Sequence, residues 1–328
     1  MQSALLEYSE MTDSVPELVT TKSTIIIGLI LASAIALAVS RVTNKARRPG
    51  GISTLNHATG LKYQSKLIEK IVVTKNVRIF RFSLPSPEHV LGLPIGKHVT
   101  LSANIRNPLN PTEPAKHISR QYTPISSDYS TRGHFDLLIK VYHKNEHPQF
   151  PEGGWMSQYL DSMSIGDVID VKGPSGRIEY MEKGRIRISQ NQLRVSQIAM
   201  IAGGTGITPM YQFIQHILIT RHGRDNTKLS LLYGNQKQSD ILMRETLEEL
   251  AIQHPGQFAL HMTVDRVEKS EGPWDGFVGY VSPEMISKSI PKPSEEMVVL
   301  LCGPPQMVRS VETHLLSLGY TRDRIYAF

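Results

Sequence analysis

Apolar and polar residues alternate along the chain from about Leu61 to Tyr180. In HVTLSANI (98–105) and HFDLLIKVY (134–142), every second position belongs to one apolar face. Short alternating strands separated by Pro/Gly turns are typical of half-buried antiparallel sheets. The pattern predicts an antiparallel β-barrel over residues 61–180, with a sandwich as the alternative.

After about residue 196 the pattern changes to continuous apolar runs, such as QIAMIA (197–202) and MVVLLCG (297–303). Runs of this kind are expected of strands that are buried on both faces. Stretches with helical spacing lie between them, for example PMYQFIQHILI, DILMRETLEELAIQ and PQMVRSVETHLLSLG. Residues 196–328 are therefore predicted to form a doubly wound parallel α/β domain, and residues 181–195 an interdomain linker.

The first 60 residues have a different character. Residues 23–40 carry no charge, and a helix of that length reaches about 27 Å, close to a ~30 Å hydrocarbon core. An acidic segment (1–22) precedes this stretch and a basic, Gly-containing linker (41–60) follows it. We expect a retained transmembrane helix with the rest of the chain in the cytosol, the alternatives being a cleaved signal peptide or a buried core helix. The short span suits the endoplasmic reticulum membrane, with the mitochondrial outer membrane as the alternative.

Composition narrows the classes of function. The single cysteine excludes an intrachain disulfide and suggests a reducing compartment. The 12 histidines are scattered, without metal-ligand spacing. The net charge of +6 suits an acidic partner or an anionic ligand, but no Lys/Arg block interleaved with aromatics suggests nucleic acid.

One candidate phosphate site is the loop in IAMIAGGTGITPM (198–210), which joins a buried strand to a helix. Its glycines Gly203, Gly204 and Gly206 do not have the G-x-G-x-x-G spacing, yet they leave backbone N–H groups accessible. Thr208 is the expected N-cap, with Pro209 in the first turn. A helix start with bare amides attracts a pyrophosphate, although a tight turn that merely needs glycine remains open.

A second candidate phosphate site combines RQYTPISS (120–127) with EGGWMSQYLDSM (152–163). In an extended strand Arg120 and Tyr122 share one side, where a guanidinium can bind a diphosphate and a phenol can lie against a flat ligand. Gly153-Gly154 precedes a short helix. The plainer alternatives are an exposed strand Arg beside a core Tyr, and an ordinary glycine-started helix. Two such sites on one chain fit two dinucleotides.

Several of these segments together resemble NADH-cytochrome b5 reductases. The shared motifs occur in the family's order and run from about Leu61 to Phe328: R-x-Y-T-P-[IV]-S, I-K-V-Y, H-P-x-F-P-x-G-G-x-M-S-Q-Y-L, G-P-S-G, I-A-G-G-T-G-I-T-P-M and C-G-P-P-x-M. The resemblance implies a membrane-anchored, monomeric flavoenzyme. In it a hydride passes from NADH to FAD, and single electrons then pass to a haem protein such as cytochrome b5.

Position by position, the resemblance also implies binding residues. Those for FAD are Arg120, Gln121, Tyr122, Thr123, Leu138, Lys140, Tyr142, His143, Gly154, Trp155, Met156, Ser157 and Thr208. Those for NADH are Gly203, Gly204, Thr205, Gly206, Asn235, Gln236, Asp240, Cys302, Gly303, Pro304 and Met307.

Three residues are expected to act at the flavin ring. Thr123 would hydrogen-bond near N5, Lys140 would stabilise negative charge on the reduced ring or the phosphates, and His98 matches a family position near the flavin. Without the resemblance, the sequence pattern favours His98 as a histidine on the surface of a strand. No acid–base pair is required, since the protein's main contribution is positioning.

Two residues of the NADH set have plainer alternatives. Asp240 would favour a free ribose 2′-hydroxyl over a 2′-phosphate, or would be a helix N-cap before Ile241, or both. Cys302 would lie near the nicotinamide without acting as a nucleophile, or would simply pack in the core.

The chain departs from the family pattern at Trp155, Gln121 and His143, where Lys, Pro and Phe are usual. Rival functions are a reductase of the same fold for a quinone, a ferric chelate or an oxygenase component, and a non-enzymatic, membrane-tethered nucleotide sensor.

Overall fold

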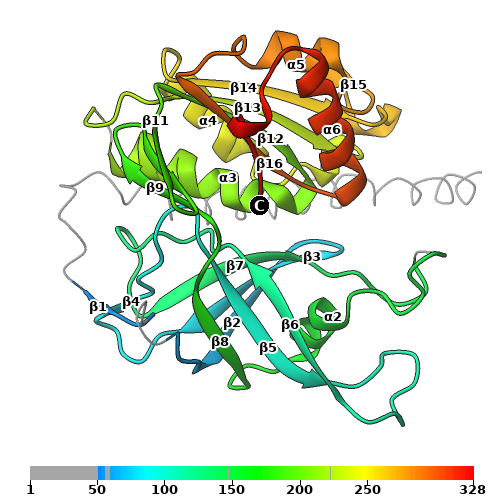
Figure 1. The fold of residues 1–328 in the computed structure, drawn as a ribbon. Helices are drawn as coiled ribbons and strands as arrows, with labels where there is room; N and C mark the ends of the chain where they lie inside the picture. Colours follow the sequence, from blue (N-terminus) through cyan, green and yellow to red (C-terminus); the bar gives the residue numbers. More distant parts are fainter. Residues whose placement is uncertain (1–50, 56–59, 147, 222) are drawn as a thin grey trace, which may run out of the picture. The chain divides into compact units, whose positions relative to one another are not determined.

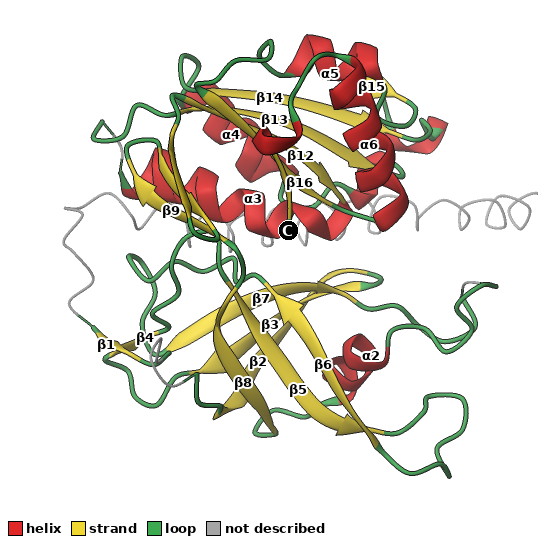
Figure 2. Ribbon diagram, in the orientation of Figure 1, coloured by secondary structure: helices red, strands yellow, loops and turns green. Residues whose placement is uncertain are grey.

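The computed structural model describes residues 51–55, 60–146, 148–221 and 223–328. The predicted segment 1–22, the predicted anchor 23–40 and most of the linker 41–60 lie outside these residues. Within the described part, no helix is both long and apolar enough to cross a membrane. Two six-stranded sheets carry the fold (Figure 1; Figure 2).

The first sheet is antiparallel throughout and has the order β6-β5-β8-β2-β3-β7. Beyond the end of edge strand β6, Ile125 N–H donates to Asp136 O on the other edge strand, β7, at 2.9 Å. The two edges of the sheet are thus joined, and the antiparallel architecture expected from the alternating pattern is confirmed. The strands are β2 (Tyr63–Thr74), β3 (Val77–Ser83), β5 (His98–Ile105), β6 (Lys116–Tyr122), β7 (His134–Lys140) and β8 (Val168–Ser175), and short β1 (Ile52–Ser53) pairs with β4 (His89–Val90).

The alternating side chains fill the interior of this sheet. Leu101 and Val99 on β5 pack in the same cluster as Phe135 and Leu137 on β7, and all four are buried. Helix α2 (Trp155–Ser162) contacts β5 and β6. Leu138, on the opposite face of β7, packs instead in the core of the second sheet. One strand of the antiparallel sheet therefore serves both cores.

The second sheet is parallel throughout, with the order β15-β14-β13-β12-β16-β17. Helices α3 and α4 contribute to the core cluster on one face, and α5 and α6 contribute to the other, so the doubly wound prediction is confirmed. The strands are β12 (Gln197–Gly203), β13 (Lys228–Asn235), β14 (Phe258–Val264), β15 (Phe277–Val278), β16 (Met297–Cys302) and β17 (Ile325–Ala327). The helices are α3 (Ile207–Ile214), continued by a π-helix (Gln215–Thr220), α4 (Arg244–Gln253), α5 (Pro283–Ser289) and α6 (Pro305–Ser317).

The segment expected to be a linker, 181–195, is folded. Strands β9 (Ile178–Glu182), β10 (Arg185–Ile188) and β11 (Asn191–Arg194) form an antiparallel meander. Its apolar side chains, fully buried Ile186 among them, pack in the core of the parallel sheet. Because these strands are short and rich in charge, their alternation is hard to distinguish from a polar linker.

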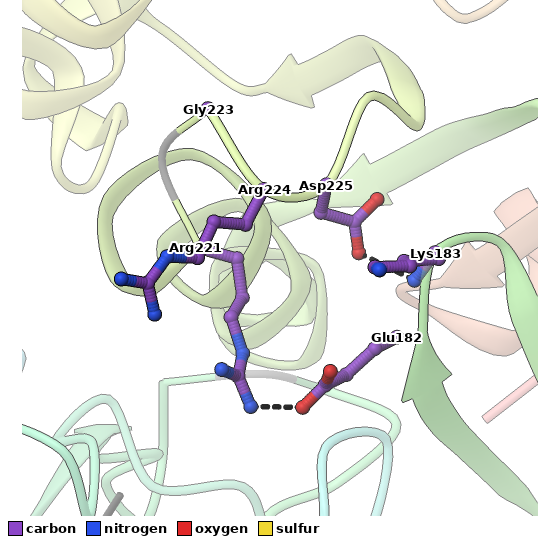
Figure 3. Close-up of a pocket in the computed structure, with 6 residues that line it drawn as sticks. All are labelled: Glu182, Lys183, Arg221, Gly223, Arg224 and Asp225. Carbon is purple, nitrogen blue, oxygen red and sulfur yellow. Dashed lines mark hydrogen bonds and ion pairs between the residues drawn. The ribbon is translucent and has the colours of Figure 1, made fainter. Parts of the chain in front are cut away.

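A polar network holds the meander to the parallel-sheet domain. The Tyr180 hydroxyl donates to Asp225 Oδ2 at 2.7 Å, and Arg221 makes an ion pair with Glu182. These groups adjoin a charged pocket of about 430 Å³, in which the Arg221 guanidinium is directed at the Glu182 carboxylate (Figure 3). Arg221 also donates to the Tyr129 hydroxyl of the antiparallel-sheet domain at 3.1 Å. The charges of Arg221, Glu182 and Asp225 therefore have structural partners.

Candidate active site

The start of α2 is tied to the end of β7. Gly154 N–H donates to Tyr142 O at 2.8 Å, while Tyr142 N–H donates to Ser157 Oγ at 3.1 Å. A Cβ added at Gly154 would lie 2.5 Å from Ser157 Oγ and 3.2 Å from Tyr142 Cβ, so this close approach needs glycine. No side chain caps the helix start, which leaves its first-turn amides available to an anion. The predicted helix start is confirmed.

Four candidate flavin residues gather beside this helix start. Arg120 and Tyr122 lie two residues apart on β6. Burial raises the pKa of the Tyr122 phenol, and the charge of Arg120 and the nearby Tyr142 act on this pKa to a smaller extent. The Lys140 ammonium lies 5.8 Å from the centroid of the Tyr142 ring. Arg120 is exposed and donates to the adjacent Ser119 O, with no carboxylate partner among the described residues. Its guanidinium is available to a phosphate.

The remaining predicted flavin residues divide by environment. Met156 is buried in the antiparallel core, so only its backbone could face a ligand. Gln121 is exposed and alternates with Arg120 and Tyr122, which puts it on the other face of β6. Thr123 and His143 are half-buried just beyond β6 and β7.

Trp155, at the first position of α2, has partners of its own. Its indole N–H donates to Glu152 Oε2 at 2.8 Å, and Asn107 holds the other carboxylate oxygen at 3.0 Å. The Lys116 ammonium lies 5.4 Å from the centroid of the indole ring. A positive charge is thus present beside α2 although the usual family lysine is not.

The second candidate site lies where the strand order of the parallel sheet reverses. From β12 the chain runs outward through β13 and β14, then returns to β16 on the other side of β12. Ligands of open α/β sheets bind at the carboxyl ends of strands at such a point. Here these ends are Gly203 of β12 and Cys302 of β16.

The glycines of this loop have two different roles. A Cβ at Gly203 would meet Met307 and come within 3.0 Å of Pro304 Cδ, and one at Gly206 would overlap the Cys302 carbonyl group. These two glycines let the loops after β12 and β16 pack against each other. Gly204, with φ +54°, faces open space, and its carbonyl accepts from the Tyr233 hydroxyl at 2.9 Å. Gly204 is therefore the glycine that leaves the backbone accessible.

Both predicted helix caps are wrong. Thr208 lies inside α3, which begins at Ile207 after a 3₁₀ turn over Gly204–Gly206, and its hydroxyl donates to Thr205 O at 3.2 Å. Asp240 lies in a 3₁₀ turn (Gln238–Asp240), and α4 starts only after Met243, whose φ is +58°. Neither start could be read from one polar residue, because a short 3₁₀ turn precedes each helix.

Two more residues at this edge have informative environments. The Asn235 side chain is buried at the end of β13, within hydrogen-bonding reach of the Tyr233 hydroxyl. Gln236, next in sequence, is exposed. Burial raises the pKa of the Cys302 thiol to about 11, so the thiol is protonated at neutral pH. A neutral thiol is not a nucleophile.

His98, at the start of β5, is neutral near pH 7. Burial, and secondarily the charge of Lys97, lowers its pKa. Its Nε2 is buried without a hydrogen-bond partner among the described residues, and a Cβ at Gly176 would lie 3.1 Å from the ring. The ring is therefore closely packed and still has an unused nitrogen.

The two candidate sites adjoin each other. Strand β7 contacts the Gly204–Gly206 turn, and Leu138 packs in the same cluster as Ile207 and Met210 of α3. A buried link joins the domains nearby, since Gly96 N–H donates to Gln212 Oε1 at 2.6 Å. Sequence reasoning missed Gln212, although it is a lone polar residue on the apolar side of a helical pattern. It also missed the loop support by Tyr233 and the position of Lys116, which only spatial contacts identify.

Family comparisons agree with this architecture. Residues 64–180 match an oxidoreductase FAD-binding domain, and residues 200–313 match an oxidoreductase NAD-binding domain. A ferredoxin NADP⁺ reductase from Neisseria gonorrhoeae shares the fold, with a TM-score of 0.58 at 18% identity over 81% of this chain and 98% of that one. Fold and domains together define an FAD- and NAD-binding oxidoreductase.

Relatives with higher sequence identity identify the family within this class. NADH-cytochrome b5 reductase 2 of Xenopus tropicalis is 47% identical over 274 residues, which are 81% of this chain and 86% of the relative. NADH-cytochrome b5 reductase 1 of Bos taurus is 45% identical over 302 residues, 90% and 93% of the two chains. The cytochrome b5 reductase domain of Ulva prolifera nitrate reductase superposes with a TM-score of 0.77 at 37% identity, covering 84% of this chain and 99% of that domain. The chain belongs to the NADH-cytochrome b5 reductase family.

Proposed function

We propose that this protein oxidises NADH through FAD and delivers single electrons to cytochrome b5 or a similar haem protein. The observation that carries the proposal is the contact of β7, the strand of Leu138 and Lys140, with the Gly204–Gly206 turn at the switch point. A flavin along β7 and a nicotinamide on that turn would be neighbours, as direct transfer over roughly 3–3.5 Å requires.

The residues present fit FAD. The uncapped start of α2 and the exposed guanidinium of Arg120 would hold the pyrophosphate, while Tyr122 and Tyr142 would lie against flat parts of the cofactor. Lys116, above the Trp155 ring, would supply the charge that relatives have at position 155. When bound, FAD supplies a two-electron acceptor that can release electrons one at a time.

Three side chains would tune and orient the flavin. Thr123 would donate a hydrogen bond near N5, and Lys140 would stabilise negative charge as it develops. His98 would offer its unused Nε2. All three would act by holding or stabilising, and none would exchange a proton with a substrate.

The residues present also fit NADH. The open backbone at Gly204 would receive a phosphate, and the Asn235 side chain at the end of β13 would bind a polar group at the sheet edge. Asp240 would accept from a ribose hydroxyl. It lies near Arg266, whose pKa is raised chiefly by the hydrogen bond and ion pair with Glu268 and to a smaller extent by Asp240. Cys302 and Gly303 would border the nicotinamide.

The proposal also covers the electron acceptor's docking surface and the membrane in which the protein is anchored. A net charge of +6 suits an acidic docking surface, and redox partners of this kind make small, salt-sensitive contacts. The uncharged stretch 23–40 supports an anchor in the endoplasmic reticulum membrane, or alternatively the mitochondrial outer membrane, with a monomeric catalytic part in the cytosol. Fractionation of the tagged full chain, compared with a chain lacking residues 1–44, tests this placement.

Anaerobic stopped-flow absorbance tests the activity. NADH should bleach the flavin band of the full chain, and oxidised cytochrome b5 should then restore the band while its haem is reduced. If cytochrome b5 reoxidises the flavin no faster than dissolved oxygen does in a separate aerobic mixing, cytochrome b5 is not the acceptor. That result would favour a quinone, a ferric chelate or an oxygenase component, for which Trp155 is the departure to examine first. A colourless protein that does not bind added FAD would leave only the nucleotide-sensor function.

A further inference from the structure

A second cavity lies at the edge of the parallel sheet opposite the candidate active site. Its volume is about 270 Å³, and we call it the basal cavity. The first residues of three neighbouring strands line it, namely Gln197 of β12, Lys228 of β13 and Phe258 of β14. The end of α5 and the residues after it, 288–291, complete the lining. Cofactors bind at the other ends of these strands, so the proposed function leaves this cavity unused.

Three unpaired polar atoms belong to residues that line the basal cavity. Ser230 Oγ, Ser289 Oγ and His261 Nδ1 are buried and have no hydrogen-bond partner among the described residues. Residues Ser230 and Ser289 are only 5% and 4% exposed. Buried polar groups are almost always hydrogen-bonded, so three without a partner around one cavity indicate partners that the chain itself does not supply.

Strand register places two of these residues on the same face of the sheet. Ser230 is paired with Ala259, and His261 lies two residues further along β14, so the side chains of Ser230 and His261 are on one face of the sheet. Helix α5 contacts both β13 and β14. The cluster under α5 is thus built by two strands and a helix rather than by one loop.

Charge and shape restrict the ligand. Lys228 is exposed and has no ion-pair partner within the described ranges, whereas the Lys288 ammonium is paired with Glu284 at 2.7 Å. His261 is neutral near pH 7, because burial lowers its pKa. Ile290 and Pro291 give part of the wall an apolar character. One free cation, two hydroxyl donors and an apolar wall match a small anion.

We propose that the basal cavity binds a small oxyanion, either a short-chain carboxylate or phosphate. The anion accepts hydrogen bonds from Ser230 and Ser289, is balanced by Lys228, and rests any short apolar tail on Ile290 and Pro291. This site is separate from the cofactor sites, and it stands or falls independently of the reductase activity.

Isothermal titration of the flavin-loaded full chain tests the site, with butyrate, inorganic phosphate and neutral butyramide as probes. One anion should bind saturably with one-to-one stoichiometry, and butyramide should bind at least about tenfold more weakly because it carries no charge. Butyrate binding more tightly than phosphate identifies a carboxylate site, and the reverse order identifies a phosphate site. Saturation by neither anion, or equal binding of butyramide, overturns the proposal.

Variants assign the binding to the basal cavity. Ser230→Ala and Lys228→Met should each weaken the anion about tenfold, the loss expected for one charge-assisted hydrogen bond. Lys66→Met, which removes the same charge from exposed β2, should bind like the unchanged protein. Binding that survives both cavity substitutions overturns the proposal.

Thermal unfolding gives a readout that does not need the ligand's affinity. Because Ser230 Oγ has no internal partner, Ser230→Ala without ligand should unfold at the same or a higher temperature. Saturating anion should raise the melting temperature of the unchanged protein more than that of the variant. A lower melting temperature of ligand-free Ser230→Ala would mean that the hydroxyl already has a partner inside the protein, which contradicts the proposal.

Discussion

Gly206 is the residue whose replacement tests the geometry of the proposed NADH site most directly. A Cβ added there would lie 2.9 Å from Gly303 N and closer still to the Cys302 carbonyl group. Both neighbours are backbone atoms, which cannot turn away as a flexible side chain could. In Gly206→Ala the loop after β12 must therefore move away from the loop after β16.

Overpacking of this kind costs about 1–3 kcal/mol. If the displacement is carried by the two loops, NADH binding loses about 5- to 150-fold in affinity, the same energy expressed as a ratio. FAD should be retained, because the groups at the start of α2 are held by Tyr142 and Ser157 and not by Gly206.

The assay is the NADH dependence of flavin bleaching, recorded together with flavin content and melting temperature. Gly256→Ala is the matched control, since a Cβ at Gly256 meets nothing within 4 Å and its backbone is not left-handed. We expect a raised KM for NADH in Gly206→Ala and no change in Gly256→Ala. If Gly206→Ala kept both its KM and its melting temperature, the two loops would not be packed as described.

Four further predictions concern single side chains. Arg120→Ala should lose FAD on gel filtration, since its guanidinium has no carboxylate partner in the described structure and would bind the pyrophosphate, whereas full flavin occupancy would remove that role. Asp240→Thr should raise kcat/KM for NADPH relative to kcat/KM for NADH. An unchanged ratio would mean that Asp240 has no role in the choice of cofactor, and Asp240 is not a helix cap either. Burial, with a smaller effect of Arg221, lowers the pKa of His216 from 6.5 to about 4. Below pH 6.5 the unfolded chain therefore binds a proton at His216 that the folded chain does not bind. The free energy of unfolding consequently falls until the pH reaches about 4. The full loss of unfolding free energy is roughly 3 kcal/mol. Between pH 7 and 5, the free energy of urea unfolding should therefore fall less in His216→Leu than in the unchanged protein. Equal falls in the two proteins would mean that another group is responsible for the pH dependence. Maleimide should label Cys302 slowly at pH 7 and faster as the pH rises, in line with the raised pKa of its thiol. Labelling of the folded chain at pH 7 as fast as that of an ordinary free thiol would contradict the raised pKa.

Periodicity and glycine positions along the chain were enough to predict the two sheets and the places where their loops turn. Alternation along β5 and β7 indicates strands with one main apolar face, and continuous apolar runs in β12 and β16 indicate strands buried on both faces. Both patterns can be recognised within a single segment of the sequence. The glycines before α2 and after β12 were equally visible, because a turn that few other residues can adopt leaves a mark in composition.

The roles of individual glycines, of the meander and of Leu138 depend on contacts that appear only in the folded chain. Gly203 and Gly206 serve loop packing while Gly204 stays open, because their neighbours come from a loop about a hundred residues away in sequence. The meander at 181–195 is buried by residues of the parallel sheet, and Leu138 belongs to a core other than that of its own sheet. Contacts between distant segments depend on the path of the whole chain, so neither periodicity nor a motif could assign them.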